Sequence, residues 1–154
     1  MTCMHAFAAA IAAATLASTA ALSAEALDHN QPKTIDGVET MCDGSSLNDR
    51  RDGDSRGYSL RIEVVGKGGQ YLGGETVTVT GNEYNVSVTC KGPWVVMKLP
   101  AGSYRVAADV PEAGHKEMDV RVSASGQRVA MFVWPNAGGE TTRPASERVA
   151  AAAQ

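Results

Sequence analysis

Short runs of alternating apolar and polar residues fill the chain from residue 58 to residue 134. In the first run, Leu60, Ile62 and Val64 form an apolar face, and charged side chains lie between them. Such alternation is typical of a β-strand that buries one face. The pattern predicts seven strands, at residues 58–64, 75–80, 84–90, 94–99, 103–110, 117–122 and 127–134. Turn residues separate the strands and no long helical pattern is present, so we predict an all-β antiparallel sandwich or barrel.

The last predicted strand is apolar on both faces. Val129, Met131 and Val133 form one face, and Ala130, Phe132 and Trp134 form the other. Because a solvated face of a sheet is normally polar, either the C-terminal tail covers one of these faces or that face meets a partner. We name Val129, Met131 and Val133 the apolar strip and take it as the candidate interaction surface.

The two ends of the chain do not show the strand pattern. Residues 6–24 are alanine-rich and uncharged, which predicts a signal helix that is cleaved after Ala24 or Ala26. The alternative is an anchoring transmembrane helix, but alanine contributes little to insertion and no basic cluster follows. We therefore expect a periplasmic or secreted protein without stable membrane insertion after cleavage. The predicted regions are a signal peptide (1–26), an irregular leader (27–57), a sandwich domain (58–135) and a disordered tail (136–154).

Export changes the interpretation of the cysteines. Cys3 is lost with the signal peptide, which leaves Cys42 and Cys90 in an oxidising compartment. An even pair there suggests one disulfide, and two unpaired thiols are the alternative. The two cysteines have no CxxC spacing and few histidines accompany them, so they do not predict a zinc site.

Length and charge limit the function classes further. The chain has 154 residues, enough for one domain, and a formal net charge of -3. Its basic residues are scattered rather than gathered in a patch of the kind that binds nucleic acid. We therefore expect no nucleic-acid partner.

The chain lacks the residue sets of common catalytic and metal sites. After residue 26 the histidines are His29 and His115, and a serine triad would have to use His115 without a Gly-x-Ser-x-Gly motif. Asp49, Asp52 and Asp54 surround a glycine as in a calcium loop, but arginines offset their charge and EF-hand spacing is absent. We therefore expect a protein that is not an enzyme and that uses no cofactor or metal.

A proline-glycine turn separates the fourth and fifth predicted strands. Pro100 suits the first corner of a tight turn, and Gly102 can adopt a positive φ. Tyr104 can bury its ring while its hydroxyl reaches a backbone group. We interpret Leu99, Pro100, Gly102 and Tyr104 as a structural turn.

The same turn resembles that of a known family. Residues 99–106 read Leu-Pro-Ala-Gly-Ser-Tyr-Arg-Val, which is similar to the Leu-Pro-x-Gly-x-Tyr-x-Val turn of transthyretin-like, carboxypeptidase regulatory-like domains. Gly-Pro-Trp at 92–94, Tyr-Leu at 71–72 and Phe-Val-Trp at 132–134 look like a group of short exported proteobacterial proteins. The resemblance covers about residues 37–134. It implies a seven-stranded Greek-key sandwich and no activity of its own, and a paired cysteine is not associated with this group.

The resemblance also implies that Trp94, Val96 and Leu99 point into the core. The aromatic residues that would stack on a sugar, if exposed, are Trp94, Trp134, Tyr71, Tyr84 and Tyr104. We therefore expect a non-catalytic binding or structural accessory module whose ligand is a protein or a cell-envelope polysaccharide. The alternative is a small secreted hydrolase with an unrecognised site.

Overall fold

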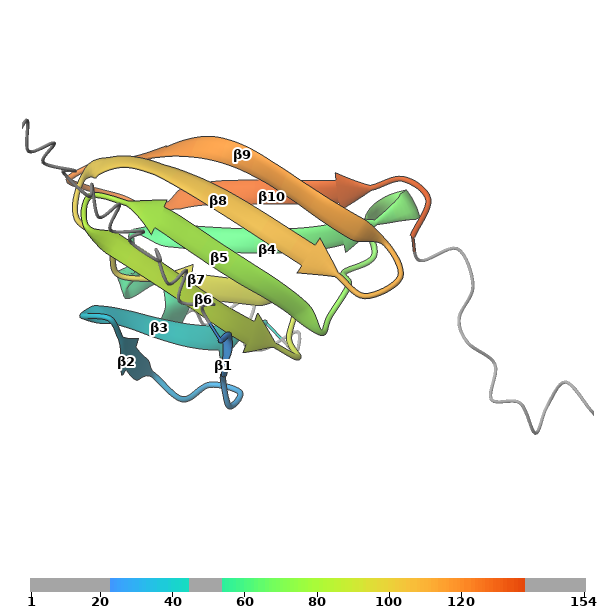
Figure 1. Ribbon diagram of the computed structural model, residues 1–154, viewed down its shortest axis with the longest axis horizontal. Coiled ribbons are helices and arrows are strands. Elements are labelled where there is room, and N and C mark those ends of the chain that lie inside the picture. Colours follow the sequence, from blue (N-terminus) through green and yellow to red (C-terminus); the bar gives the residue numbers. More distant parts are fainter. Residues whose placement is uncertain (1–22, 45–53, 138–154) are drawn as a thin grey trace, which may run out of the picture.

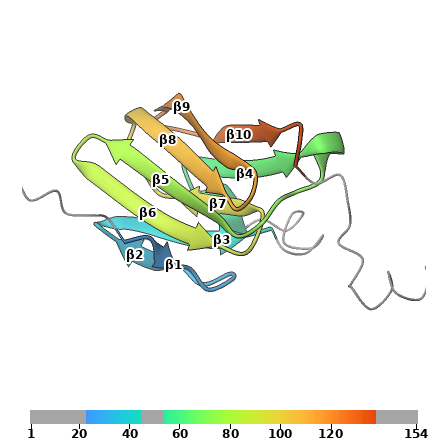
Figure 2. The same ribbon diagram turned by 45° about the vertical axis from the view of Figure 1, so that its right-hand side comes forward.

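The computed structural model describes residues 23–44 and 54–137, which form two β-sheets packed face to face (Figures 1 and 2). The strands are β1 (Glu25–Ala26), β2 (Lys33–Ile35), β3 (Val38–Asp43), β4 (Leu60–Gly66), β5 (Glu75–Gly81), β6 (Tyr84–Cys90), β7 (Trp94–Met97), β8 (Gly102–Val110), β9 (Gly114–Val122) and β10 (Arg128–Trp134). The front sheet of Figure 1 has the order β1-β6-β5-β8-β9, and the back sheet has the order β10-β4-β7-β3-β2. Neighbouring strands are antiparallel, except that β1 is parallel to β6 and β10 to β4. The predicted all-β sandwich is confirmed.

The seven predicted strands are present as β4 to β10, but the described residues contain ten strands. The other three lie at residues 25–43, most of which the alternation pattern assigned to an irregular leader. β3 is a full member of the back sheet, between β7 and β2. Its polar Thr40 is fully buried and its apolar Met41 belongs to a separate cluster, so apolar and polar residues do not alternate along it. The predicted irregular segment at 27–57 is therefore wrong where β2 and β3 lie, and these two strands were not among the seven predicted ones.

A two-residue turn joins β2 to β3. Asp36 and Gly37 have φ values of 48° and 80°, as the central residues of a type I′ hairpin turn require. Ile35 and Val38 flank the turn and pair with each other. This Asp-Gly pair is the sequence signal that identifies the hairpin.

The main core lies between the two sheets. It contains the inner side chains of both sheets, which are almost fully excluded from solvent. Among the largest fully buried side chains are Tyr104, Phe132, Leu60, Ile62 and Met97. Burial of one such side chain contributes about 1.5–3 kcal/mol, and the loss of chain entropy on folding offsets most of the sum.

Both faces of β7 are buried, and the expected orientation of its side chains is reversed. Val95 and Met97 belong to the core between the sheets. Trp94 and Val96 point to the outer face of the back sheet, where they are 4% and 0% exposed. The expectation that Trp94 and Val96 point into the sandwich core is therefore wrong, whereas Leu99 lies there as expected. Alternation cannot choose between two faces that are both covered.

Several groups cover Trp94 on the outer face. The Tyr71 ring meets the Trp94 ring edge-on at a centroid distance of 6.0 Å, and the Arg61 guanidinium lies 4.5 Å from the centroid of the same ring. A Cβ at Gly44 would lie 2.7 Å from the ring, so only glycine fits there. Beside Trp94, the side chains of Met41, Tyr58 and Val96 form a small second core.

The turn before β8 is held by a tyrosine. Tyr104 is 2% exposed, and its hydroxyl donates a hydrogen bond of 2.9 Å to the Pro100 carbonyl oxygen. This confirms the predicted burial of the ring and the predicted contact of its hydroxyl. Gly102 does not have a positive φ, contrary to prediction. A Cβ at this position would meet the Asn82 side-chain amide, so a larger residue requires that amide to move.

Removing the Tyr104 hydroxyl should weaken the fold slightly. We expect Tyr104→Phe to lower the free energy of unfolding by about 0.5–1.5 kcal/mol, because the Pro100 carbonyl oxygen loses the hydrogen bond from the Tyr104 hydroxyl. Tyr84→Phe is the matched control, since Tyr84 is only half-buried. Urea unfolding measures both. Equal losses in the two variants would contradict a specific role for the Tyr104 hydroxyl.

Both ends of the described chain are attached to the sandwich. Glu25–Ala26 pairs with β6, and the Leu27 N–H donates to the Thr89 carbonyl oxygen at 3.0 Å. At the other end, the Ala137 carbonyl oxygen accepts a hydrogen bond of 2.8 Å from the Lys67 N–H, so the predicted disorder is wrong for 136–137. The rest of the predicted signal peptide (1–22) and tail (138–154) lies outside the described residues. Within the described ranges, no helix is long and apolar enough to span a membrane.

Candidate functional site

β10 presents the apolar strip to solvent. Val129, Met131 and Val133 are 36%, 49% and 46% exposed, and within residues 23–44 and 54–137 they are the exposed large hydrophobic side chains. The alternate residues of the strand, such as Phe132, are buried in the core between the sheets. The structure therefore brings the predicted candidates together as one row on the outer face of the back sheet.

β10 is also the edge strand of the back sheet. The Arg128 N–H donates a hydrogen bond of 2.8 Å to the carbonyl oxygen of Ser59, the residue that precedes β4. The main-chain groups of Arg128 therefore face β4. Main-chain groups point to opposite sides at successive residues of a strand, so those of the apolar strip face the open edge. At that edge, the Val133 carbonyl oxygen accepts a hydrogen bond from the Lys116 Nζ atom of β9. Apart from the Val133 carbonyl oxygen, which Lys116 already occupies, the same three residues thus offer apolar side chains and main-chain hydrogen-bonding groups at this edge.

Positive side chains lie at both ends of this edge. Arg128 is exposed at the start of β10. Near its end, the Lys116 Nζ atom lies 5.4 Å from the centroid of the Trp134 ring. Among the described residues, neither cation is in an ion pair, whereas Arg61 on β4 is paired with Glu63 at 2.8 Å. The open edge is therefore apolar in its middle and positive at both ends.

A cleft of about 630 Å³ opens at the end of the sandwich, beside the end of β10. The residues that line it are Leu72, Gly73, Val110, Pro111, Glu112, Ala113, His115, Lys116, Trp134, Pro135, Asn136 and Ala137. Its volume is that of a small-molecule site. Its ionisable side chains, Glu112, His115 and Lys116, are exposed or half-buried, so none of them is a desolvated group that specifies a ligand.

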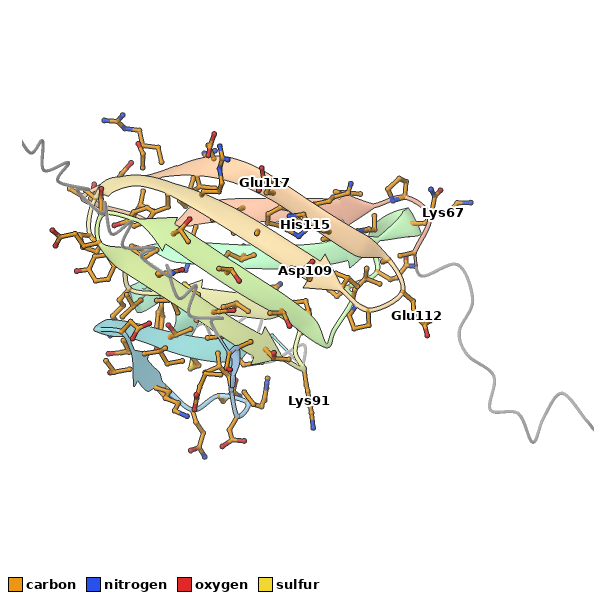
Figure 3. All side chains as sticks on the ribbon, in the orientation of Figure 1. Lys67, Lys91, Asp109, Glu112, His115 and Glu117 are labelled. Atoms are coloured by element: carbon orange, nitrogen blue, oxygen red, sulfur yellow. A yellow bond between two sulfur atoms is a disulfide. The ribbon has the colours of Figure 1, made fainter. Side chains whose placement is uncertain are left out.

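His115 forms a pair with Asp109 on the outer surface of the front sheet. The Nδ1 atom of His115 lies 2.8 Å from the Asp109 Oδ1 atom, and both side chains are about half exposed. Glu117 approaches the other ring nitrogen at 4.0 Å, and Figure 3 shows the three side chains close together on β8 and β9. A triad needs a nucleophile at that second nitrogen. A carboxylate occupies this place instead, so the pair does not form a triad.

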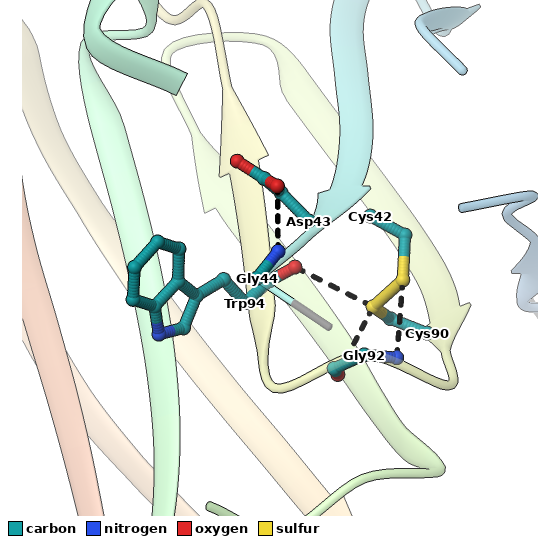
Figure 4. The surroundings of a disulfide bond; sticks show 6 residues. All are labelled: Cys42, Asp43, Gly44, Cys90, Gly92 and Trp94. Carbon is teal, nitrogen blue, oxygen red and sulfur yellow. Dashed lines mark hydrogen bonds between the residues drawn. A yellow bond between two sulfur atoms is a disulfide. The ribbon is translucent and has the colours of Figure 1, made fainter. Parts of the chain in front are cut away.

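The predicted disulfide is confirmed and joins the two sheets. Cys42 of β3 and Cys90 of β6 are bonded, with their Cα atoms 5.5 Å apart, and both are buried (Figure 4). The Gly92 N–H donates a hydrogen bond of 3.3 Å to the Cys42 sulfur. The Cys90 sulfur lies 3.2 Å and 3.4 Å from the carbonyl oxygens of Gly92 and Trp94. A disulfide sulfur carries no proton, so these two approaches are close contacts without donation.

A buried carboxyl group lies next to the disulfide in the front sheet. Glu75 is the cross-strand partner of Cys90 and is 0% exposed. Neither of its carboxyl oxygens has a hydrogen-bond partner of good geometry among the described residues. Burial raises the pKa of Glu75 to about 8, and its own backbone N–H opposes this only in part. Glu75 is not among the predicted site residues, although it shares the inward parity of Val77 and Val79.

Two exposed carboxyl groups have pKa values that are shifted by cationic neighbours. A hydrogen bond from Arg105 lowers the pKa of Asp119. The hydrogen bond from Lys98 has the largest effect on the pKa of Glu39 and lowers it, and the hydrogen bond from Tyr58 lowers it further. Both pairs are on the surface, where an ion pair contributes little to stability.

The aromatic residues do not form an open platform for a sugar. Trp94 and Trp134 are each 4% exposed, and Tyr104 is buried in the turn. Tyr71 and Tyr84 are half-buried. Stacking on a sugar requires an accessible ring face, and none of these five side chains is fully exposed.

The remaining candidate residues form no site in the described chain. His29 is exposed and bridges to Cys42 of β3. Asp49 and Asp52 of the calcium-like loop lie outside the described residues, and the side chain of Asp54 is not described. Residues 23–44 and 54–137 contain no group of three histidine, cysteine or acidic residues that could hold a metal ion.

Comparison with known proteins assigns no family to the chain. No protein-family model and no curated protein sequence matches it. The interpretation of the site therefore rests on the residues described above.

A charge placed on the apolar strip should leave the fold intact. We expect Met131→Lys or Val133→Lys to change the free energy of unfolding by less than about 0.5 kcal/mol, as at other surface positions. Phe132→Ala, one residue away on the buried face, is the matched control and should lose about 3–5 kcal/mol. Urea unfolding of the variants measures the difference. A loss in the lysine variants as large as in the control would show that the strip is covered.

Proposed function

We propose that this chain is a non-catalytic accessory module that binds a protein partner through the apolar strip. The observation that carries the proposal is the exposure of Val129, Met131 and Val133 in one row on an edge strand. An unprotected apolar edge promotes aggregation, and proteins usually shield it with charges or short strands. β10 keeps three apolar side chains in its middle, and an interface is the physical reason to keep them.

The proposed fold type is a Greek-key sandwich that resembles the transthyretin-like, carboxypeptidase regulatory-like domains. The order β6-β5-β8-β9 opposite β10-β4-β7, with connections that cross between the sheets, supports this type. The turn at Tyr104 supports it as well. Export to the periplasm or the cell exterior is part of the proposal, and the buried disulfide between Cys42 and Cys90 supports it, because such bonds persist in oxidising compartments.

Two other functions have weaker support. Binding of a cell-envelope polysaccharide would have to use the half-buried rings of Tyr71 and Tyr84. A small secreted hydrolase would have to use His115 and Asp109, but among the described residues the carboxylate of Glu117, and not a nucleophile, approaches the other ring nitrogen of His115.

Site-specific photocrosslinking in cells of the source organism tests the proposal. A photoreactive amino acid replaces Met131, and the matched control places it at Glu117, which is about half exposed on the front sheet. We expect a protease-sensitive adduct of defined mass from position 131 and none from position 117. A protease-resistant glycan adduct, or no adduct, would contradict a protein partner. Ester or peptide turnover that is lost in His115→Ala would contradict a non-catalytic role.

A further inference from the structure

The open edge of β10 combines two features that an extended polypeptide segment matches. The side chains of the apolar strip are exposed on the outer face of the back sheet. The main-chain groups of the same residues point to the open edge, because those of Arg128 and its alternates face β4. A flat protein surface would use the side chains alone, whereas an added strand uses both.

We propose that β10 binds its partner by strand addition, and that the partner contributes an extended segment of alternating apolar and acidic residues. The added strand extends the back sheet beyond β10. Its apolar side chains continue the row formed by the apolar strip on the outer face. This inference rests on the proposed function and specifies how the partner binds.

The positions of two cations are the reason to expect acidic residues between the apolar residues of the partner segment. Successive side chains of the added strand point to opposite faces, so the residues between its apolar ones point toward β9. On that side Lys116 lies near one end of β10, and Arg128 lies at the other end. Glu117 and Asp119 of β9 point instead to the outer face of the front sheet, where they approach Arg105. Among the described residues on this side, acidic side chains of the partner therefore meet Lys116 and Arg128 and neither acid of β9.

The same charges make a second copy of this chain a poor occupant. In a symmetric antiparallel pair centred on Met131, Arg128 of one copy lies opposite Trp134 of the other. Lys116 lies against Trp134, so each end of the pair brings two cations together. Like charges placed opposite each other destabilise a strand pair. An acidic segment removes this repulsion.

The test uses the full chain and a synthetic peptide of about eight alternating valine and glutamate residues, the usual length of a strand. We expect saturable binding with a Kd below about 1 mM. Hydrogen exchange followed by NMR should show slower exchange of the Val129, Met131 and Val133 amides when the peptide is present. A control peptide of valine and lysine should bind more weakly.

Two variants separate the main-chain contact and the charge contact. Met131→Pro removes an N–H that faces the open edge, and Met131→Ala removes only the side chain. We expect the proline variant to bind the peptide about three- to tenfold more weakly than the alanine variant, as for one lost hydrogen bond. Lys116→Glu should weaken binding of the glutamate peptide by about threefold or more and strengthen binding of the lysine peptide.

Several results would overturn strand addition. They are the absence of saturable peptide binding, binding without protection of the three amides, and equal affinities of the proline and alanine variants. A dimer in analytical ultracentrifugation that Met131→Lys abolishes would assign the edge to a second copy instead. The crosslink at position 131 decides separately whether the strip meets a protein at all, so failure of strand addition alone leaves the proposed function standing.

Discussion

Loss of the Cys42–Cys90 disulfide is expected to lower the free energy of unfolding by about 4 kcal/mol in the double variant Cys42→Ala/Cys90→Ala. The two cysteines are 48 residues apart in sequence, and closing a loop of this size restricts the unfolded chain by about that amount in the chain-entropy model. The bond also links β3 of the back sheet to β6 of the front sheet. Guanidinium unfolding measures the loss, which is a large part of the stability of about 5–15 kcal/mol that is usual for a domain.

Chemical reduction of the native chain is the control for this prediction. The reduced protein keeps both sulfur atoms in the core, so it loses the cross-link without the cavities that alanine leaves. We expect nearly the same loss of stability as in the double variant. The dependence of unfolding on denaturant should become steeper in both, because the unlinked chain exposes more surface. A loss below about 1 kcal/mol in both samples would show that the cross-link does not limit the unfolded chain.

Replacement of the buried carboxyl group should stabilise the protein at neutral and basic pH. Glu75 is fully buried, and burial raises its pKa from the ordinary value of 4.5 to about 8. Between these two pH values the unfolded chain loses the proton and the folded chain keeps it. The Glu75 contribution is therefore fully present below pH 4.5, falls as the pH rises to about 8, and then stays constant.

The measurable result is a difference that grows with pH. We expect the stability of Glu75→Gln minus that of the native chain to rise by about 1.4 kcal/mol per pH unit within this window. The cost of burying the amide does not affect this slope, because glutamine does not titrate. Glu83→Gln is the control for loss of a carboxyl group at the surface, since Glu83 is exposed in a turn. Urea unfolding at several pH values measures both, and a flat difference for Glu75→Gln would contradict the raised pKa.

Alternation along the sequence was enough to locate strands β4 to β10 and to predict the sandwich. It also predicted correctly that Val129, Met131 and Val133 share one face of β10. These predictions succeed because a strand projects successive side chains to opposite faces whatever surrounds it. The disulfide follows from the even pair of cysteines that remains after the predicted signal peptide and from the expected compartment, without any knowledge of the strands that carry them.

The alternation failed where a strand has no solvated face or carries a polar residue inward. The resemblance implies the wrong face for Trp94, and alternation does not correct it because both faces of β7 are apolar and covered. β3 was missed because Thr40 points inward and Met41 points outward. For Glu75, alternation predicts that the side chain points inward. It does not predict whether the carboxyl oxygens have hydrogen-bond partners there.

The sequence by itself established that β10 has two apolar faces, and the tertiary structure established which of them is covered. Phe132 lies in the core between the sheets, whereas Met131 lies on an open face. The structure also placed β10 at an edge, parallel to β4, with Lys116 of β9 at its free side. Alternation is a local property of the backbone. The neighbours of a strand come from residues far away in the chain, so only the folded arrangement determines which surface remains available for a partner.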